Sequence, residues 1–377
     1  MAEPAAPSVV DFDLHGFVGI RVLDATGPET DAIRRQLGPI EAPLDREPDL
    51  VVRFVDKLPA TTPARILGTD EVGYTDDAFL VLRGRGHARV RISMPLDRIG
   101  QRSVEIACEH GAHGIPLLIA LVNLCALGNG VLPLHASAFV HRGTGVLVTG
   151  WAKGGKTEAL LAFMSRGAHY VGDEWIYIDP ATRLMHGIPE PMRLWSWHLR
   201  SMPAYGRRVG AAGRLRLRTI ETLIGGMDAV GGTPLAPSRA RRLLGRVLPV
   251  ARRQLSVQVP PRRLFGDAAV ASAELQRVVL VGNHDRAEIL ARATDGHEIG
   301  RRMVHSLTYE RSELLSYYQR FRFAFPERSN PLLDHAEASA ADLLERCLAG
   351  VPAFELLHPY PVDIPALYEA LDPVLAC

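Results

Sequence analysis

The stretch GVLVTGWAKGGKTEALLAF, residues 145–163, decides the fold of this 377-residue chain. Its centre, residues 150–157, reads GWAKGGKT and fits G-x-x-x-x-G-K-[ST], the pattern of a loop that cradles phosphate groups. An apolar run, GVLVT, precedes this centre, and TEALLAFMSRG, which is typical of a helix, follows it. The pattern requires a strand before the loop and a helix after it. We therefore predict a phosphate-binding loop between a buried strand and a helix over residues 157–165.

The residue types in this loop match the chemistry of nucleotide binding. Gly150, Gly154 and Gly155 would let backbone N–H groups point inward at a phosphate, and the helix that follows adds the positive end of its dipole. Lys156 would reach the β- and γ-phosphates, and the Thr157 hydroxyl would ligate Mg²⁺. The predicted cofactors are therefore ATP and Mg²⁺.

Two of the three lysines in the chain, Lys153 and Lys156, lie in this one turn, whereas the remaining basic residues, Lys57 apart, are arginines. An ammonium group is a compact charge that suits phosphate oxygens, a role that the planar fork of arginine fills differently. Lys153 has two open interpretations: it adds a second phosphate contact, or it is solvated at the tip of the loop.

The bulk composition excludes several protein classes. Hydrophobic residues make up 47% and charged residues 23% of the chain, which is typical of a globular protein. The formal net charge of +1 creates no overall electrostatic field that would attract the protein to nucleic acid or to a membrane. The four cysteines are far apart and form no C-x-x-C pair, so neither a zinc site nor a disulfide framework is indicated. The N-terminus lacks a signal pattern, and the longest apolar run, residues 115–127, is shorter than the roughly 20 residues of a membrane span. We expect a cytoplasmic protein with no nucleic-acid or membrane partner.

The pattern of strands and helices divides the chain into two regions. Residues 1–110 are predicted to form a β-rich accessory or recognition region, with strands near 17–24, 49–56, 78–83 and 88–94. Residues 111–377 are predicted to form the α/β domain that carries the loop. The elements expected there are a buried helix (114–127), a hairpin (132–149), a strand interrupted by two acids (169–179), strands at 184–188 and 276–282, helices at 309–320 and 335–349, and a strand, turn and helix (354–371).

An arginine-rich insertion, residues 200–263, interrupts the second region. It contains fourteen arginines against only Glu221 and Asp228. The segment could bind nucleotide phosphates, an acidic peptide or nucleic acid, or it could be a solvated insertion. The low net charge and the lack of aromatic residues within the arginine cluster at 207–218 argue against a nucleic-acid groove.

Features beyond the loop resemble the HPr kinase/phosphorylase family of the phosphoenolpyruvate-carboxykinase-like superfamily, over residues 134–178. As in that family, a histidine, His135, stands fifteen positions before the first loop glycine, and the run GVLVTG leads into the loop. A helix ending in Arg-Gly and an apolar strand into two consecutive acids follow as RGAHYVGDE, residues 166–174. The resemblance implies a P-loop kinase core with a mixed sheet, serine kinase activity and a homo-oligomer.

The chain also departs from the family pattern. The loop carries Trp151 where the family usually has an acid and Lys153 where it usually has a glycine, and the paired aspartates appear as Asp173 and Glu174. No counterpart of the E-[IV]-R-G-x-G signature follows. Because that signature is tied to the carrier protein and to phosphorolysis, we expect a different acceptor, as in the more distant relatives that phosphorylate serine in other targets.

Candidate site residues follow from position and from the resemblance. Asp173 is expected to act as base or metal ligand and matches the catalytic aspartate of the family, while Glu174 is the expected Mg²⁺ partner beside Thr157. His135 is expected to orient a phosphate or to steady Asp173. Arg193 lies after the strand that follows the acids and could reach the transferred phosphate.

The function expected from these residues is an ATP- and Mg²⁺-dependent phosphotransferase that acts on a serine or other hydroxyl of a protein or peptide. Two alternatives stay open. One is a small-molecule kinase, or a carboxykinase-type decarboxylase, on the same core. The other is a nucleotide-binding regulatory or assembly protein without transfer activity.

Overall fold

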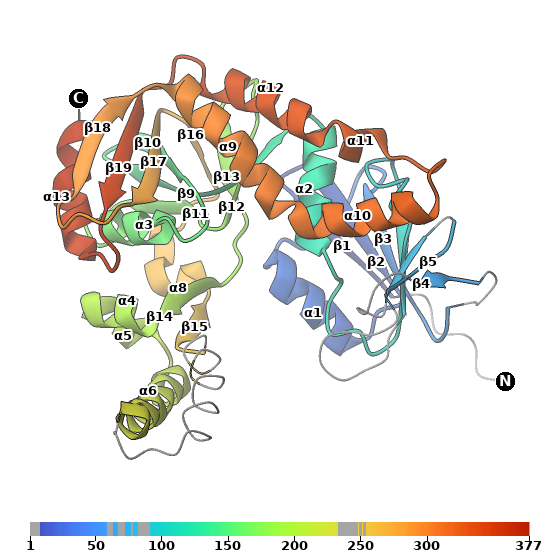
Figure 1. Cartoon of the computed structure of the whole chain (residues 1–377), viewed down its shortest axis with the longest axis horizontal. Coiled ribbons are helices and arrows are strands. Elements are labelled where there is room, and N and C mark those ends of the chain that lie inside the picture. The colour runs from blue at the N-terminus through green and yellow to red at the C-terminus, as the bar shows by residue number, and fades with distance from the viewer. Residues whose placement is uncertain are drawn as a thin grey trace.

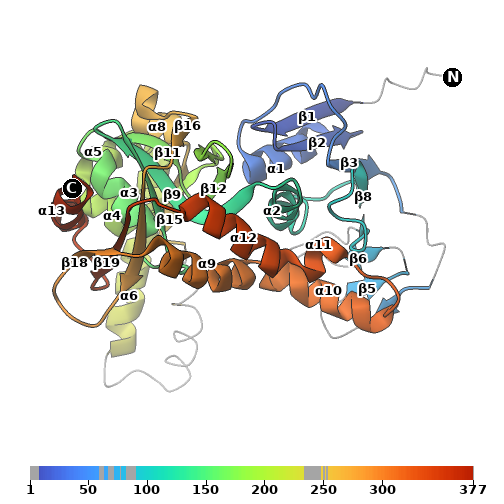
Figure 2. The same cartoon turned by 90° about the horizontal axis from the view of Figure 1, so that it is seen from above.

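The computed structural model describes residues 8–58, 63–66, 72–76, 78–81, 91–232, 248, 251 and 254–376. Within these residues the chain forms two mixed β-sheets and one two-stranded ribbon, with helices on both faces of the second sheet. The fold is therefore mixed α/β with a β-rich N-terminus, as the sequence predicts. The two sheets lie toward opposite ends of the molecule, with helices running along one side between them (Figures 1 and 2).

The first sheet contains the strands of the β-rich region in the order β1-β2-β3-β8-β7-β6-β5-β4. The strands β2, β3 and β8 run parallel, and the other pairs are antiparallel. Helix α1 (Gly27–Leu37), which the sequence analysis did not predict, joins β2 to β3 and makes this parallel connection possible. The strand bounds are β1 Val9–Leu14, β2 Val18–Leu23, β3 Leu50–Val55, β4 Arg65–Ile66, β5 Val72–Tyr74, β6 Phe79–Val81, β7 Ile92–Met94 and β8 Val104–Glu109.

The second sheet, hereafter the central sheet, has the order β16-β13-β12-β9-β10-β17-β19-β18, and β11 pairs with β9 beside β12. The strands β10, β17 and β19 run parallel at its centre, and the flanking pairs are antiparallel. The bounds are β9 Leu132–His141, β10 Thr144–Thr149, β11 His169–Gly172, β12 Trp175–Ile178, β13 Leu184–Gly187, β16 Ser272–Glu274, β17 Arg277–Asn283, β18 Leu290–Thr294 and β19 Ala353–His358.

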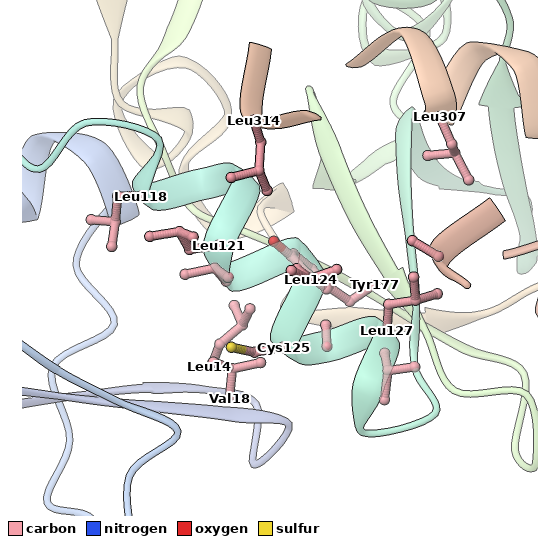
Figure 3. Close-up of a cluster of buried hydrophobic side chains, with 14 of the residues drawn as sticks. Leu14, Val18, Leu118, Leu121, Leu124, Cys125, Leu127, Tyr177, Leu307 and Leu314 are labelled. Carbon is pink, nitrogen blue, oxygen red and sulfur yellow. The ribbon is translucent and has the colours of Figure 1, made fainter. Parts of the chain in front are cut away.

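Hydrophobic cores cover both faces of the central sheet. Because side chains alternate along a strand, Val146 and Val148 of β10 join the core with α3 (Lys156–Met164) and α13 (Ile364–Leu375), whereas Leu147 joins the core on the other face. That second core includes α2 (Leu118–Gly128), α9 (Gly296–Glu310), α10 (Ser312–Ala324) and α12 (Ala336–Leu348) and continues into the first sheet. In Figure 3, the leucines of α2 lie between Leu14 and Val18 on one side and Leu314 on the other.

The arginine-rich segment and the residues just before it form a two-stranded ribbon, β14 (Met192–Trp195) with β15 (Ser256–Val259), and several helices. These helices are α4 (Ser196–Ser201), α5 (Pro203–Arg208), α6 (Ala211–Gly232) and α8 (Pro261–Phe265). Helix α6 projects away from the central sheet (Figure 1). Residues 233–247, 249–250 and 252–253 of the segment lie outside the described residues, so the expected insertion is tested only in part.

Most predicted elements of the α/β region are confirmed, with three corrections. The interrupted strand at 169–179 is two strands, β11 and β12, because the chain breaks at the two acids. The helix expected at 309–320 begins at Ser312 as α10, and α9 before it was not predicted, although Ile299, Met303 and Leu307 have helical spacing. The helix at 335–349 is α12, preceded by the short α11 (Pro331–Asp334). No helix in the described part of the chain has both the length and the apolar character needed to cross a bilayer.

Candidate functional site

The loop between β10 and α3, residues 150–155 and hereafter the glycine loop, has an unusual backbone. Gly150, Lys153 and Gly155 have φ angles of 150°, 63° and 108°, a region that glycine tolerates and other residues rarely adopt. Gly155 caps α3 in a left-handed conformation without a side-chain cap. The loop therefore turns its backbone sharply at the start of a helix, where amide N–H groups have no intrahelical partner.

Two glycines of the loop are required by close neighbours. A Cβ at Gly150 would overlap the carbonyl oxygen of Val281, and a Cβ at Gly155 would overlap Nε2 of His358. Val281 and His358 lie near the carboxyl ends of β17 and β19, the two strands parallel to β10. The carboxyl ends of three parallel strands thus meet at the glycine loop, the usual position of a ligand site in an α/β sheet.

Lys156 is buried within this loop. Its side chain is 6% exposed, and Nζ donates hydrogen bonds to the carbonyl oxygens of Gly150 (3.2 Å) and Trp151 (3.1 Å). Burial lowers the pKa of Lys156 from its ordinary value, and the carboxylates of Glu174 and Asp173 oppose that effect. The ammonium is therefore held at the centre of the loop, close to two acids.

The register of a hairpin explains the fifteen-residue spacing between His135 and Gly150. Strands β9 and β10 are joined by Arg142 and Gly143 alone, and Ala136 lies opposite Thr149. His135 is the next residue outward on β9, so the hairpin brings it beside the first residue of the loop. The fifteen-residue spacing in the sequence therefore reflects the fact that His135 and Gly150 are neighbours across the hairpin.

The two acids lie where the strand breaks. Strand β11 pairs with the C-terminal part of β9 and β12 with its beginning, and Asp173 and Glu174 occupy the gap between them. Glu174 has a φ angle of 72°, and its carbonyl oxygen accepts from the amide of Ala136 at 3.1 Å. At this break Asp173 contacts Thr157, which follows the glycine loop, and Glu174 contacts His135.

Asp173 contacts the first turn of α3. Its carboxylate accepts a hydrogen bond from the Thr157 hydroxyl, with distances of 3.0 Å to Oδ2 and 3.2 Å to Oδ1. Asp173 is only 3% exposed, and burial, followed by the charge of Glu174, raises its pKa from 3.8 to about 7. A carboxyl group with a pKa near neutrality can both accept and release a proton at physiological pH.

Glu174 belongs to a second chain of contacts. His135 lies between two carboxylates, with Nε2 3.1 Å from Glu174 and Nδ1 2.5 Å from Glu310, and its ring stacks on Trp175 at 5.5 Å. Burial by itself lowers the pKa of His135, but the two hydrogen bonds outweigh it, so the pKa is raised. The raised pKa favours the ring form in which both nitrogens donate, one to each acid. His135 contacts Glu174 directly and influences Asp173 only through charge.

Two site residues were missed by sequence reasoning. Glu310 ends α9, which the sequence did not reveal, and no local motif marks it. Glu190 lies between two prolines before β14. Its Oε1 is buried and makes no hydrogen bond among the described residues, and burial together with Glu174 and Asp173 raises its pKa to about 8. Three acids, Asp173, Glu174 and Glu190, therefore influence one another.

Lys153 and Arg193 lie at the edge of this group. Lys153 is exposed at the loop tip, where its carbonyl oxygen accepts from the side-chain amide of Asn283 at 3.1 Å. Arg193 is exposed on β14, and its charge helps to lower the pKa of Glu174, after the stronger effects of His135 and Lys156. Neither residue makes an ion pair within the described chain. The structure therefore leaves both side chains free to contact a ligand.

A cavity of about 720 Å³ is lined by residues of the first region and by chain neighbours of the acids, although Asp173, Glu174 and Glu190 do not line it themselves. Tyr170 and Val171 of β11 line it, as do Pro189 and Pro191, which flank Glu190. Arg35 of α1 and Arg262 of α8 contribute positive charge to its wall, whereas Arg34 is ion-paired with Asp31 and Glu41. The first sheet is anchored here, because His15 lies 2.9 Å from the carbonyl oxygen of Gly187.

The residues fit a magnesium ion that arrives with phosphates. Among the described residues, no three His, Cys, Asp or Glu side chains gather into a metal site of their own. Mg²⁺, however, uses one or two carboxylates together with phosphate oxygens and water. The unpartnered Glu190 oxygen and the raised pKa of Asp173 show an excess of carboxyl groups, which a divalent cation would neutralise.

Comparison with known proteins adds no relative: no family model matches this chain, and a search of curated proteins gives no match.

Proposed function

We propose that this protein is an ATP- and Mg²⁺-dependent kinase that transfers the γ-phosphoryl group to a serine or other hydroxyl of a protein or peptide. The observation that carries the proposal is the glycine loop itself: Lys156 is buried inside it, and Thr157 at its end is hydrogen-bonded to Asp173. A purely structural turn has no need to bury an ammonium beside a carboxyl group whose pKa is near 7. The features that resemble the HPr kinase/phosphorylase family support the same reaction and a P-loop kinase core.

Each residue has a role that follows from its contacts. The amides of the glycine loop and Lys156 would bind the phosphates, since both present N–H donors at the carboxyl ends of the parallel strands. Asp173 would accept the proton of the acceptor hydroxyl as its oxygen bonds to the γ-phosphorus and the bond from that phosphorus to ADP breaks. His135 would hold Glu174 in position through its hydrogen bond.

Mg²⁺ bound with ATP would neutralise negative charge on the phosphates. Thr157 and Glu174, with Asp173 nearby, are the residues that would hold it. The cavity of about 720 Å³ that chain neighbours of the acids line is large enough for side chains of an acceptor peptide, and the exposed Arg35 and Arg262 in its wall favour an acidic one. The proposed partner is therefore a protein or peptide rather than a nucleic acid.

The first experiment measures ATP binding by calorimetry with and without Mg²⁺. We expect binding in the wild type, loss of binding in Lys156→Ala, and retained binding in Asp173→Asn. Lys57→Ala is the matched control, because Lys57 is exposed in the first region and remote in sequence from the loop. Absence of ATP binding in the wild type would remove the basis of the proposal.

The second experiment follows transfer of labelled phosphate from ATP to serine-containing peptides encoded near the gene, with alanine versions as controls. Asp173→Asn should abolish transfer, whereas Asp342→Asn, which changes an exposed acid of α12, should not. Transfer to small hydroxyl compounds alone would favour a small-molecule kinase. Equal ATP turnover in the wild type and Asp173→Asn would favour a regulatory protein without transfer.

A further inference from the structure

The amino end of α2 presents backbone donors without partners. The helix begins at Leu118 after Leu117, which has a left-handed φ of 60°, and no side chain caps it. The first turn contains a weak backbone bond from the amide of Leu118 at 3.4 Å and a normal one from the amide of Leu121 to Leu117 at 2.9 Å, whereas the amides of Ile119 and Ala120 make no hydrogen bond among the described residues. With eleven residues, α2 also directs the positive end of its dipole here.

A buried arginine faces the same place. Arg311 joins α9 to α10 and is 7% exposed, yet its side chain makes no hydrogen bond or ion pair within the described residues, and Nε is among the buried atoms without a partner. Burial lowers the pKa of Arg311, and the charge of Glu337 opposes this without forming an ion pair. An arginine is rarely buried without a partner, because removing a guanidinium from water is costly.

Both features line one cavity of about 270 Å³. Asn123 also lines it; the Oδ1 atom of Asn123 accepts from the Tyr177 hydroxyl at 2.6 Å, which leaves its amide group as a further donor. Leucines form much of the remaining wall, and Figure 3 shows one of them, Leu314, reaching toward α2. The cavity therefore combines hydrogen-bond donors with an apolar surface.

The acids at this cavity do not neutralise Arg311. Glu310 is hydrogen-bonded to His135, and Glu313 is exposed on α10. The Gln36 side chain is also occupied, since it donates to the carbonyl oxygen of Ile115 and accepts from its amide, both at 2.9 Å. The donors of the cavity thus lack an acceptor of their own.

We propose that this cavity binds the carboxylate or phosphate group of a small ligand, with the anion on Arg311 and the amino end of α2 and the apolar body of the ligand on the leucines. The inference does not depend on the proposed kinase function. A ligand here would contact Trp175 and Glu310, which line the cavity and also hold His135. Ligand binding in this cavity would therefore change the surroundings of His135 in the candidate site.

The test uses three probes of similar shape on the full chain: benzoate, phenyl phosphate and the neutral benzamide. Binding is measured by calorimetry and by ligand-observed NMR. We expect an anionic probe to bind more tightly than benzamide, and the tighter of benzoate and phenyl phosphate identifies the group for which the cavity is built. Benzamide binding as tightly as both anions, or no anion binding at all, overturns the proposal.

Two variants locate the site. Arg311→Met should weaken anion binding at least tenfold, and the protein without ligand should be as stable as the wild type or more so, because an unpaired buried charge is removed. Leu314→Trp should block binding by filling the cavity from its apolar side. Arg301→Met, at an exposed arginine of α9, is the matched control and should bind like the wild type. Unchanged binding in both Arg311→Met and Leu314→Trp places the anion elsewhere and refutes the inference.

Discussion

Replacing Asp173 with Asn should stabilise the protein at alkaline pH. Asp173 is 3% exposed, and burial beside Glu174 raises its pKa from 3.8 to about 7. Because a tenfold change in ionisation corresponds to about 1.4 kcal/mol, the ionised carboxylate lowers the free energy of unfolding by about 4 kcal/mol relative to a solvated one. Asn keeps the shape but carries no charge, and it keeps an oxygen for the Thr157 hydroxyl. We expect Asp173→Asn to gain about 2–4 kcal/mol at pH 8.

The sign of the pH dependence follows from proton binding. Between pH 3.8 and about 7 the folded protein holds the Asp173 proton and the unfolded chain does not. The contribution of Asp173 to the free energy of unfolding therefore falls as the pH rises through this window. The variant lacks that contribution, so its advantage over the wild type should be large at pH 8 and small near pH 4.

Urea denaturation of both proteins at several pH values measures the effect. Glu174→Gln is the informative control, because the hydrogen bond from His135 is the main cause of the lowered pKa of Glu174, so its removal should destabilise the protein instead. If Asp173→Asn unfolds at a lower urea concentration than the wild type at pH 8, or if its advantage does not change with pH, the argument from burial is wrong.

Three further predictions concern the loop, the histidine and the core. Gly155→Ala should weaken ATP binding at least tenfold in calorimetry, because the new methyl group overlaps His358 and the φ of 108° disfavours alanine; normal binding would contradict this. Glu310→Gln should lower the pKa of His135, followed by NMR titration, since it removes one of two stabilising carboxylates; the stability that protonated His135 contributes at low pH should then be lost at a lower pH as the pH rises. Leu124→Ala, at a fully buried position on α2, should cost about 2–5 kcal/mol in urea denaturation, and a cost below about 1 kcal/mol would show that α2 is not central to the core.

Local patterns in the sequence were sufficient to predict the strand, the glycine loop and the helix of the candidate site. The apolar run before the glycine loop is β10, and the residues after the loop form α3, because short-range periodicity determines whether a segment can bury one face as a strand or a helix. The position of His135 beside Gly150 also depends on local structure alone, because a hairpin with a two-residue turn fixes which residues lie opposite one another. The predicted boundary between residues 110 and 111 remains a prediction, as does the recognition role of the first region.

Contacts between distant segments were decided only by the tertiary structure. Glu310 contacts His135, and Arg311 lines the same cavity as the amino end of α2, because α9 and α10 share a core with the central sheet and the first sheet. No motif in residues 296–324 indicates either arrangement. Burial likewise gives Asp173 and Glu190 their raised pKa values, although in the sequence they look like ordinary acids. The sequence alone determined which residues could perform phosphate chemistry, because that depends on residue type and local backbone. The tertiary structure decided which side chains are desolvated and paired, because desolvation and charge interactions depend on distances in space rather than along the chain.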